Sequence, residues 1–374
     1  MNPLTPLIFF FGKSMFRHVL LFAGLALISW LMALGGIGWG GYFLWIALIL
    51  LATIIIWRAG DFFSSAATYI QEKHDIPQSI KAAVIDAIAS SFPEFCVAVI
   101  AVLMIGRAEV GISSIVGSAL YNVLVIPAAS GLVAASPMVI SREVVWRDNI
   151  FYFGVVLLLG AMLWIFPNEW GAGVALLFLL AYLGYVFLLH RDFKKSRNQE
   201  REANITEKIV DDEDDELELT SEKNAWFWIL IMMIIMGGAS HLLVESSLAL
   251  GDMLGIDGVI MGFVVIAAGT SVPDTALSVI SAKKGQYDAA VSNVFGSNIF
   301  DICVCLSIPI LLALAMSGET TNINLPQTGL IWSLIGATLL AIFFFWSNNY
   351  TLTKIKAGMM GMLYLLIILV SFTF

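Results

Sequence analysis

Charged residues are scarce in this chain of 374 residues: Asp, Glu, Lys and Arg together make up 13% of it, and hydrophobic residues make up 59%. Soluble domains carry about 25% charged residues, which cover their surface. With a mean hydropathy of +0.90, the composition therefore excludes a soluble globular protein. It indicates an integral membrane protein.

Cysteines are also few, and strand-like alternation is missing. Cys96, Cys303 and Cys305 all fall in apolar runs, so the sequence implies no disulfide framework. The apolar runs are continuous, whereas the strands of a membrane β-barrel alternate between apolar and polar residues. The chain should therefore cross the membrane as helices.

The apolar runs long enough for a helical span of about 20 residues number eleven. They lie near 18–36, 40–58, 76–105, 110–134, 149–167, 170–190, 224–250, 256–282, 288–314, 327–347 and 356–373. With the N-terminus in the cytoplasm, all of the 19 basic residues except Arg107 fall on the cytoplasmic side. Because cytoplasmic loops carry an excess of Lys and Arg, we predict this orientation, with the C-terminus outside and the cell membrane as the location.

The chain divides into four parts. Residues 1–39 form an N-terminal hydrophobic segment. Its apolar run, 18–36, follows Lys13 and Arg17 and is interpreted either as an extra span, which we expect, or as a signal peptide. Residues 40–190 and 224–374 form two repeat domains. Residues 191–223 form an acidic cytoplasmic loop, and its run DDEDDELE at 211–218 is predicted to be a solvated tether.

Two segments recur inside apolar runs: AIASSFPE at 87–94 and AAGTSVPD at 267–274. Downstream of each, VGSALYN at 116–122 matches FGSNIFD at 295–301 after a deletion of one residue. The two copies lie in the third and eighth runs, so an odd number of crossings separates them and they enter the membrane from opposite sides. An inverted duplication with broken helices is typical of secondary transporters that bind their substrate near the membrane midplane.

Each copy places a carboxylate where the membrane core is expected. An acid there costs roughly 2.5–3.5 kcal/mol on insertion scales. Proline lacks an N–H, and hydroxyl pairs precede it, so we predict that both helices break and leave carbonyl oxygens beside the acids. The residues of the predicted breaks are Ser90, Ser91 and Pro93 before Glu94, and Thr270, Ser271 and Pro273 before Asp274.

The downstream motifs add further oxygen ligands: Ser118 and Asn122 from the first copy, Ser297 and Asp301 from the second. Carboxylate, hydroxyl, amide and carbonyl oxygens without sulfur or imidazole suit a hard cation such as Ca²⁺, which takes 6–8 oxygens. Asp301 is a third buried acid, so the predicted site carries a formal charge of −3.

The motif pairs ASSFPE with GSALYN, and GTSVPD with GSNIFD, resemble the two alpha repeats of the sodium/calcium exchangers of the calcium/cation antiporter superfamily. The resemblance covers essentially the whole of 40–373. It implies an all-α polytopic fold: a ten-helix core of two inverted five-helix repeats, plus one extra N-terminal hydrophobic helix. It also implies a Na⁺-driven Ca²⁺ antiporter rather than an enzyme, with Ca²⁺ and Na⁺ as transported ions and no cofactor.

The same resemblance implies ligand sets. Glu94 and Asp274 would share the Ca²⁺ ion, helped by main-chain oxygens near Ser90 and Thr270. The sodium sites would be formed by Ala87, Ser90 and Ser118 with Asp274, and by Ala267, Thr270 and Ser297 with Glu94, with Asn122 and Asp301 at the centre. Besides these ions and the lipid bilayer, no nucleic acid and no protein partner is predicted.

Some residues depart from the family pattern. Leu277 stands where the potassium-dependent exchangers have a hydroxyl, and Asp86 occupies an ordinarily apolar position. Asp86 could line an inner aqueous vestibule or pair with Lys81 near the membrane surface, and we weigh these two interpretations equally.

Other functions remain alternatives at this point. H⁺/Ca²⁺ exchange and K⁺-dependent Na⁺/Ca²⁺ exchange are the closest ones, and a channel would use similar ligands. An intramembrane aspartyl protease is disfavoured, because Arg58-Ala59-Gly60-Asp61 fails the GxGD pattern of those enzymes.

Overall fold

The structure is a computed structural model that describes residues 5–35, 38–74, 87–200, 221–325 and 329–372. Helices account for nearly all of it. The first half contains α1 (Thr5–Leu34), α2 (Gly40–Lys73), α4 (Ala87–Ser90), α5 (Phe92–Val99), η2 (Ile100–Ile105), α6 (Ala108–Val133), β1 (Met138–Val139), α7 (Arg142–Val144), η3 (Val145–Asn149), α8 (Ile150–Ile165), β2 (Glu169–Trp170) and α9 (Ala172–Glu200). The η segments are π-helical turns.

The second half repeats this order. It contains α10 (Glu222–Leu254), α11 (Gly258–Met261), η4 (Gly262–Ile266), α12 (Ala267–Thr270), α13 (Val272–Lys283), α14 (Tyr287–Phe300), η5 (Asp301–Cys305), α15 (Ser307–Ser317), β3 (Thr321–Asn322), α16 (Gly329–Tyr350), β4 (Thr351–Leu352) and α17 (Lys354–Ser371).

Within the described residues, eight helices are long and apolar enough to cross a membrane, and the bent pair Gly258–Thr270 and Val272–Lys283 adds a ninth span. Phe16–Met32 and Phe92–Ile105 are shorter apolar helices. Together they occupy the eleven predicted runs, so the predicted all-α membrane fold is confirmed.

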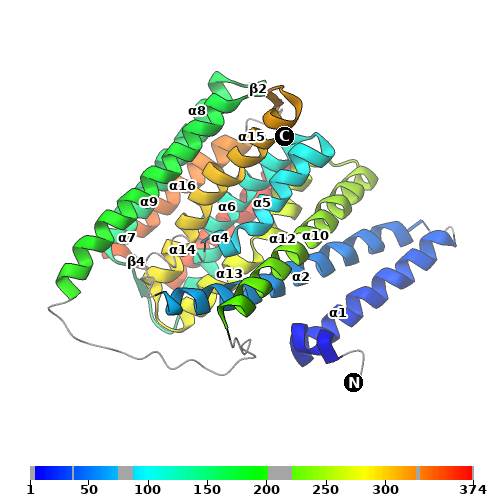
Figure 1. Cartoon of the computed structure of the whole chain (residues 1–374), viewed down its shortest axis with the longest axis horizontal. Helices are drawn as coiled ribbons and strands as arrows, with labels where there is room; N and C mark the ends of the chain where they lie inside the picture. Colours follow the sequence, from blue (N-terminus) through cyan, green and yellow to red (C-terminus); the bar gives the residue numbers. More distant parts are fainter. Residues whose placement is uncertain (1–4, 36–37, 75–86, 201–220, 326–328, 373–374) are drawn as a thin grey trace.

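Two β-pairs show the inverted relation between the repeats. β1 follows α6 and pairs antiparallel with β4, which follows α16, so that Met138 lies opposite Leu352. β2 follows α8 and pairs antiparallel with β3, which follows α15, so that Glu169 lies opposite Asn322. These two pairs exchange the roles of the repeats and lie at opposite ends of the helix bundle (Figure 1).

The two ends also differ in charge, and we name them accordingly. The basic end contains β1, β4 and the turn between α13 and α14, which carries Lys283 and Lys284. The opposite end contains β2, β3 and Arg107. By the positive-inside rule, the basic end is the predicted cytoplasmic side.

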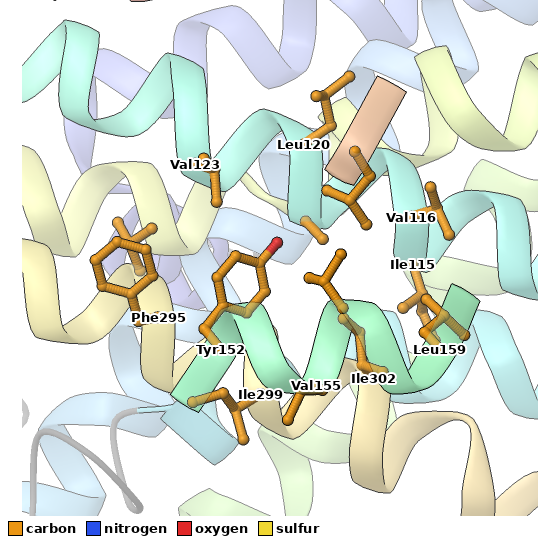
Figure 2. Packing of buried hydrophobic residues seen from close by; sticks show 14 of the residues in the cluster. Ile115, Val116, Leu120, Val123, Tyr152, Val155, Leu159, Phe295, Ile299 and Ile302 are labelled. Atoms are coloured by element: carbon orange, nitrogen blue, oxygen red, sulfur yellow. The ribbon is translucent and has the colours of Figure 1, made fainter. Parts of the chain in front are cut away.

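The main hydrophobic core lies where α6, α8 and α14 meet. Figure 2 shows Val116, Leu120, Tyr152, Phe295 and Ile299 among the side chains that fill this region, and all five are fully buried. Because α6 and α14 belong to different repeats, this packing holds the two halves of the chain together. It also leaves the polar faces of α6 and α14 to meet elsewhere, at the site described below.

Two helices extend well beyond the runs that hydropathy predicted. α1 begins at Thr5 rather than near 18, and α2 continues to Lys73 rather than ending near 58. Arg58, predicted to follow the span, lies inside α2, where it pairs with Asp61 at 3.6 Å and stacks over the Phe62 ring at 4.6 Å. Pairing of charges one turn apart lets a helix continue through polar residues, so hydropathy alone placed its end too early. In Figure 1, α1 lies beside α2 and apart from the rest of the bundle.

Candidate functional site

Both predicted helix breaks are present, and they lie at Ser91 and Ser271. Ser91 separates α4 from α5 with a ψ of 3°, and Ser271 separates α12 from α13 with the same ψ. A regular α-helix has a ψ of about −42°. The axes bend by 45° at the second break. Pro93 and Pro273 lie in the first turn after the breaks, where a missing N–H is tolerated. The expected unwound segment is a single residue in each repeat.

Each break puts an acid into the first turn of the next helix. Glu94 lies in the first turn of α5 and Asp274 in the first turn of α13, and both are fully buried. The N-terminus of a helix carries partial positive charge and stabilises a nearby anion. The two acids, one from each repeat, also lie within electrostatic range of each other. The inverted repeats therefore bring two acids to one buried place.

Serines connect the first acid to the other repeat. Ser118 of α6 donates a hydrogen bond to Glu94 Oε1 at 3.3 Å, and its oxygen lies 2.9 Å from Ser271 Oγ. If Ser271 donates to Ser118 and Ser118 donates to Glu94, each hydroxyl has one acceptor for its proton. The break residue of the second repeat thus supports the acid of the first.

The second acid has the mirrored set of contacts. Ser297 of α14 donates to Asp274 Oδ2 at 2.8 Å, and its oxygen lies 2.6 Å from Ser91 Oγ. Asn122 Nδ2 donates to the same carboxylate oxygen at 2.9 Å. Ser91 and Ser271 were predicted only as break residues, and the structure places their hydroxyls in the cluster as well.

The hydroxyls expected beside the acids take partly different partners. Thr270 Oγ1 donates to the carbonyl oxygens of Ile266 and Ala267, each at 3.2 Å, and also lies within hydrogen-bonding reach of Glu94. Ser90 lies within reach of Asp274. Ala267 is fully buried at the start of α12. Ala87 begins α4, while Asp86 lies outside the described residues.

Asp301 and Asn122 occupy matched positions in the two repeats. Both are fully buried. Asp301 begins η5, accepts a weak hydrogen bond from Cys305 Sγ at 3.8 Å, and lies within electrostatic range of Glu94 and Asp274. Within the described residues, however, no three acidic, His or Cys side chains lie close enough to hold one metal ion. Glu94, Asp274 and Asp301 therefore do not gather into one compact group of three acids.

Asn298 is a residue of the cluster that the sequence analysis missed. It is fully buried, accepts from Asn122 Nδ2 at 3.0 Å, and donates to the carbonyl oxygen of Ala119 at 3.2 Å. The first repeat has Ala119 at the matching position. The asparagine in the GSN triplet was the available signal, because a buried amide must find partners.

Several oxygens of this cluster have no hydrogen-bond partner. They are Glu94 Oε2, Asp274 Oδ1, Asn122 Oδ1 and Asp301 Oδ2, and all four belong to fully buried side chains. A buried polar oxygen left without a partner costs about 1–3 kcal/mol, and more when it is charged. Oxygens of this kind gathered around two carboxylates are able to coordinate a dehydrated hard cation.

Comparisons with known proteins agree with this arrangement. The family model described as sodium/calcium exchanger protein matches residues 44–190 and 224–373. The inner membrane protein YrbG of Escherichia coli is 29% identical over 71% of this chain and 79% of its own length. Human sodium/potassium/calcium exchanger 5 is 26% identical over 86% of this chain and 80% of its own length.

Solved structures show the same fold. The sodium-calcium exchanger NCX_Mj superposes with a TM-score of 0.59 at 19% identity, covering 88% of this chain and 98% of that chain. The H⁺/Ca²⁺ exchanger CAX gives a TM-score of 0.69 at 15% identity, covering 96% of this chain and 89% of that chain. The human relative and both solved structures are named exchangers, not enzymes, and the family model covers both repeats. The chain therefore belongs to the sodium/calcium exchanger protein family.

Proposed function

We propose that this chain is a secondary antiporter that exchanges Ca²⁺ for Na⁺ by alternating access at a midplane site. Glu94 and Asp274 hold the Ca²⁺ ion jointly. Ser90, Thr270 and nearby main-chain oxygens assist them, while Ser118, Ser297, Asn122 and Asp301 complete the sites for Na⁺.

The observation that carries this proposal is the set of buried oxygens without partners on Glu94, Asp274, Asn122 and Asp301. They come from both repeats. Three hydrogen bonds join the repeats within this cluster: Ser91 with Ser297, Ser118 with Ser271, and Asn122 with Asp274. A cation that binds between two rocking halves can be exposed to either side in turn.

Hydroxyl and amide groups favour Na⁺ over H⁺ as the driving ion. A proton needs only a carboxylate, whereas Na⁺ needs several oxygens at once. Ser118 and Ser297 each donate to a carboxylate and accept from one serine of the other repeat, which leaves each hydroxyl one lone pair for a cation. Relatives of this chain are named exchangers of sodium and calcium, which supports the same choice.

K⁺-dependent exchange is a second candidate. Human sodium/potassium/calcium exchanger 5 aligns over 86% of this chain. Asp301, an acid opposite the neutral Asn122, offers one additional negative charge for a further monovalent cation. The transport experiment below distinguishes the two couplings.

Transport driven by single ion gradients tests the proposal. The purified protein is reconstituted into proteoliposomes, and ⁴⁵Ca²⁺ uptake is measured with a Na⁺, K⁺ or H⁺ gradient imposed separately. We expect uptake to follow the outward Na⁺ gradient and to be insensitive to a pH gradient. Uptake that follows only the pH gradient would contradict Na⁺ coupling.

The acids are tested in the same assay. Glu94→Gln and Asp274→Asn each keep the shape of the side chain and remove one of the two ligand charges, so each should abolish uptake. Asp252→Asn, an exposed acid near the end of α10, is the matched control and should transport normally. If both site variants exchange at the wild-type rate, the proposed site is wrong.

A further inference from the structure

A second polar pair lies one helical turn beyond Asp274, toward the basic end. α13 and α14 run antiparallel, and Ser297 on α14 contacts Asp274 on α13 at 2.8 Å. Four residues further along α13 is Ser278, and four residues earlier on α14 is Asn293. Asn293 Nδ2 donates to Ser278 Oγ at 3.2 Å. The two helices therefore form a second polar contact four residues along from the first. At 1.5 Å per residue, it lies about 6 Å from Asp274 along α13.

Asn293 is buried, and its side-chain amide lacks one hydrogen-bond partner. Its exposed fraction is 5%, Ser278 is fully buried, and Asn293 Oδ1 has no hydrogen-bond partner. The same amide lies within hydrogen-bonding reach of the Asp274 carboxylate. Asn293 therefore connects the site to Ser278 and keeps one oxygen available for another ligand.

The first repeat lacks this pair. There Glu94 contacts Ser118 at 3.3 Å, and the next positions in the same register are Ala98 and Ser114. Ala98 lines a nearly closed space of about 10 Å³ whose other walls are apolar side chains: Val102, Ile112, Leu306 and Ile310 among them. An open cleft of about 450 Å³ lies beyond it at the opposite end, lined by Val102, Ala108 and the polar Glu319, Thr320 and Asn322. One turn beyond the acids the two repeats therefore differ: a hydrogen-bonded polar pair follows Asp274, whereas Ala98 follows Glu94 and the hydroxyl of Ser114 has no hydrogen-bond partner.

We propose that Asn293 and Ser278 form an additional subsite for a monovalent cation, on the basic-end side of Asp274. This inference rests on the proposed function, since it assumes that Na⁺ reaches Asp274 from that end. The subsite supplies two neutral oxygens and shares a carboxylate that already serves the main site. Such a set suits a partly hydrated monovalent cation, because a divalent one needs more ligand charge. A Na⁺ ion that enters from the basic end would bind at this subsite before it displaces Ca²⁺ from the main site.

Sidedness of the Na⁺ dependence tests the subsite. Na⁺-driven ⁴⁵Ca²⁺ transport is measured in right-side-out and inside-out membrane vesicles, with Na⁺ varied on one face at a time. Asn293→Ala should raise the half-saturating Na⁺ concentration about threefold to tenfold at the basic end. This is the change expected when the ion loses one oxygen ligand that contributes about as much free energy as a hydrogen bond. Half-saturation at the opposite end should not change. Asn293→Asp, which adds charge, should lower the value at the basic end.

Ser114→Ala, the matched position of the first repeat, is the control and should leave half-saturation at the basic end unchanged. If Asn293→Ala does not reach the membrane, Ser278→Ala carries the test with the same expected direction. An equal shift at both ends, or no shift at either, overturns the subsite. Absence of any Na⁺-driven transport in the wild-type protein would instead overturn the proposed function.

Discussion

At the scale of single residues, the acids of the cluster are unequal. Glu94 and Asp274 each begin a helix after a break and each receive a serine hydrogen bond. Asp301 accepts a weak hydrogen bond from Cys305 and lies within hydrogen-bonding reach of Ser91, and its repeat counterpart Asn122 is neutral. Asp301 is therefore the acid without an acidic counterpart in the other repeat, and we expect it to act on the monovalent ions.

Asp301→Asn should change the dependence of transport on Na⁺ and K⁺ rather than abolish Ca²⁺ binding. Loss of a charged ligand is worth about 1.5–3 kcal/mol, so half-saturation for the monovalent ion should shift about tenfold or more. Exchange rates at varied Na⁺ and K⁺ measure this, with Asp252→Asn as the control. Unchanged dependence on both ions would remove this role.

The acids could be predicted from the sequence, but the hydrogen bonds around them could not. Glu94 and Asp274 could be found because an acid after a proline inside an apolar run has few structural explanations. The pairing of Ser91 with Ser297 could not be found, because it depends on how helices of different repeats are placed. For the same reason Asn293 and Ser278, each an ordinary polar residue in the middle of a helix, could not be predicted to form a pair before the register of α13 and α14 was known.

At the scale of helices, the position of α6 depends on a glycine. A Cβ added at Gly117 would clash with the carbonyl oxygen of Phe263 in η4 and lie 2.8 Å from Ala267 Cβ. Gly117 directly precedes Ser118, which contacts Glu94. The close approach of α6 and η4 therefore sets where a site hydroxyl lies.

Gly117→Ala should push α6 away from η4 and disturb both stability and the site. Forcing an extra methyl into a packed contact costs about 1–3 kcal/mol. Thermal unfolding of the purified protein and ⁴⁵Ca²⁺ binding are the two measurements. Gly154→Ala on α8, where a Cβ meets nothing within 4 Å, is the control. Equal behaviour of the two variants would show that the contact between α6 and η4 is not limiting.

Another contact between helices lies at the basic end and surrounds Asp148 of η3. Asp148 is fully buried, pairs with Arg147 at 2.7 Å, and accepts hydrogen bonds from Tyr185 of α9 and Ser292 of α14. This cluster ties α14, which carries Ser297 and leads directly into Asp301, to the first repeat. The two hydrogen-bond donors lie 37 and 144 residues away from Asp148 in the sequence, so spacing could not predict these contacts.

At the scale of the whole molecule, the inverted repeat explains why the site exists. The first repeat supplies Glu94 and the second supplies Asp274 and Asp301, and only opposed insertion places the first turns of α5 and α13 together. The same symmetry is incomplete: Asn298 faces Ala119 across the repeats, and Ser278 with Asn293 has Ala98 and Ser114 as its counterpart. The surroundings of the two acids are therefore chemically different, although the acids themselves occupy matched positions.

The central claim is that acids from both repeats hold one Ca²⁺ ion that Na⁺ displaces. Equilibrium binding of ⁴⁵Ca²⁺ to the purified protein tests it most directly, with Na⁺ or choline as competitor. The account predicts saturable binding of one ion per chain, displaced by Na⁺ but not by choline, and lost in both Glu94→Gln and Asp274→Asn. Binding that survives in either variant, or that Na⁺ fails to displace, would contradict it.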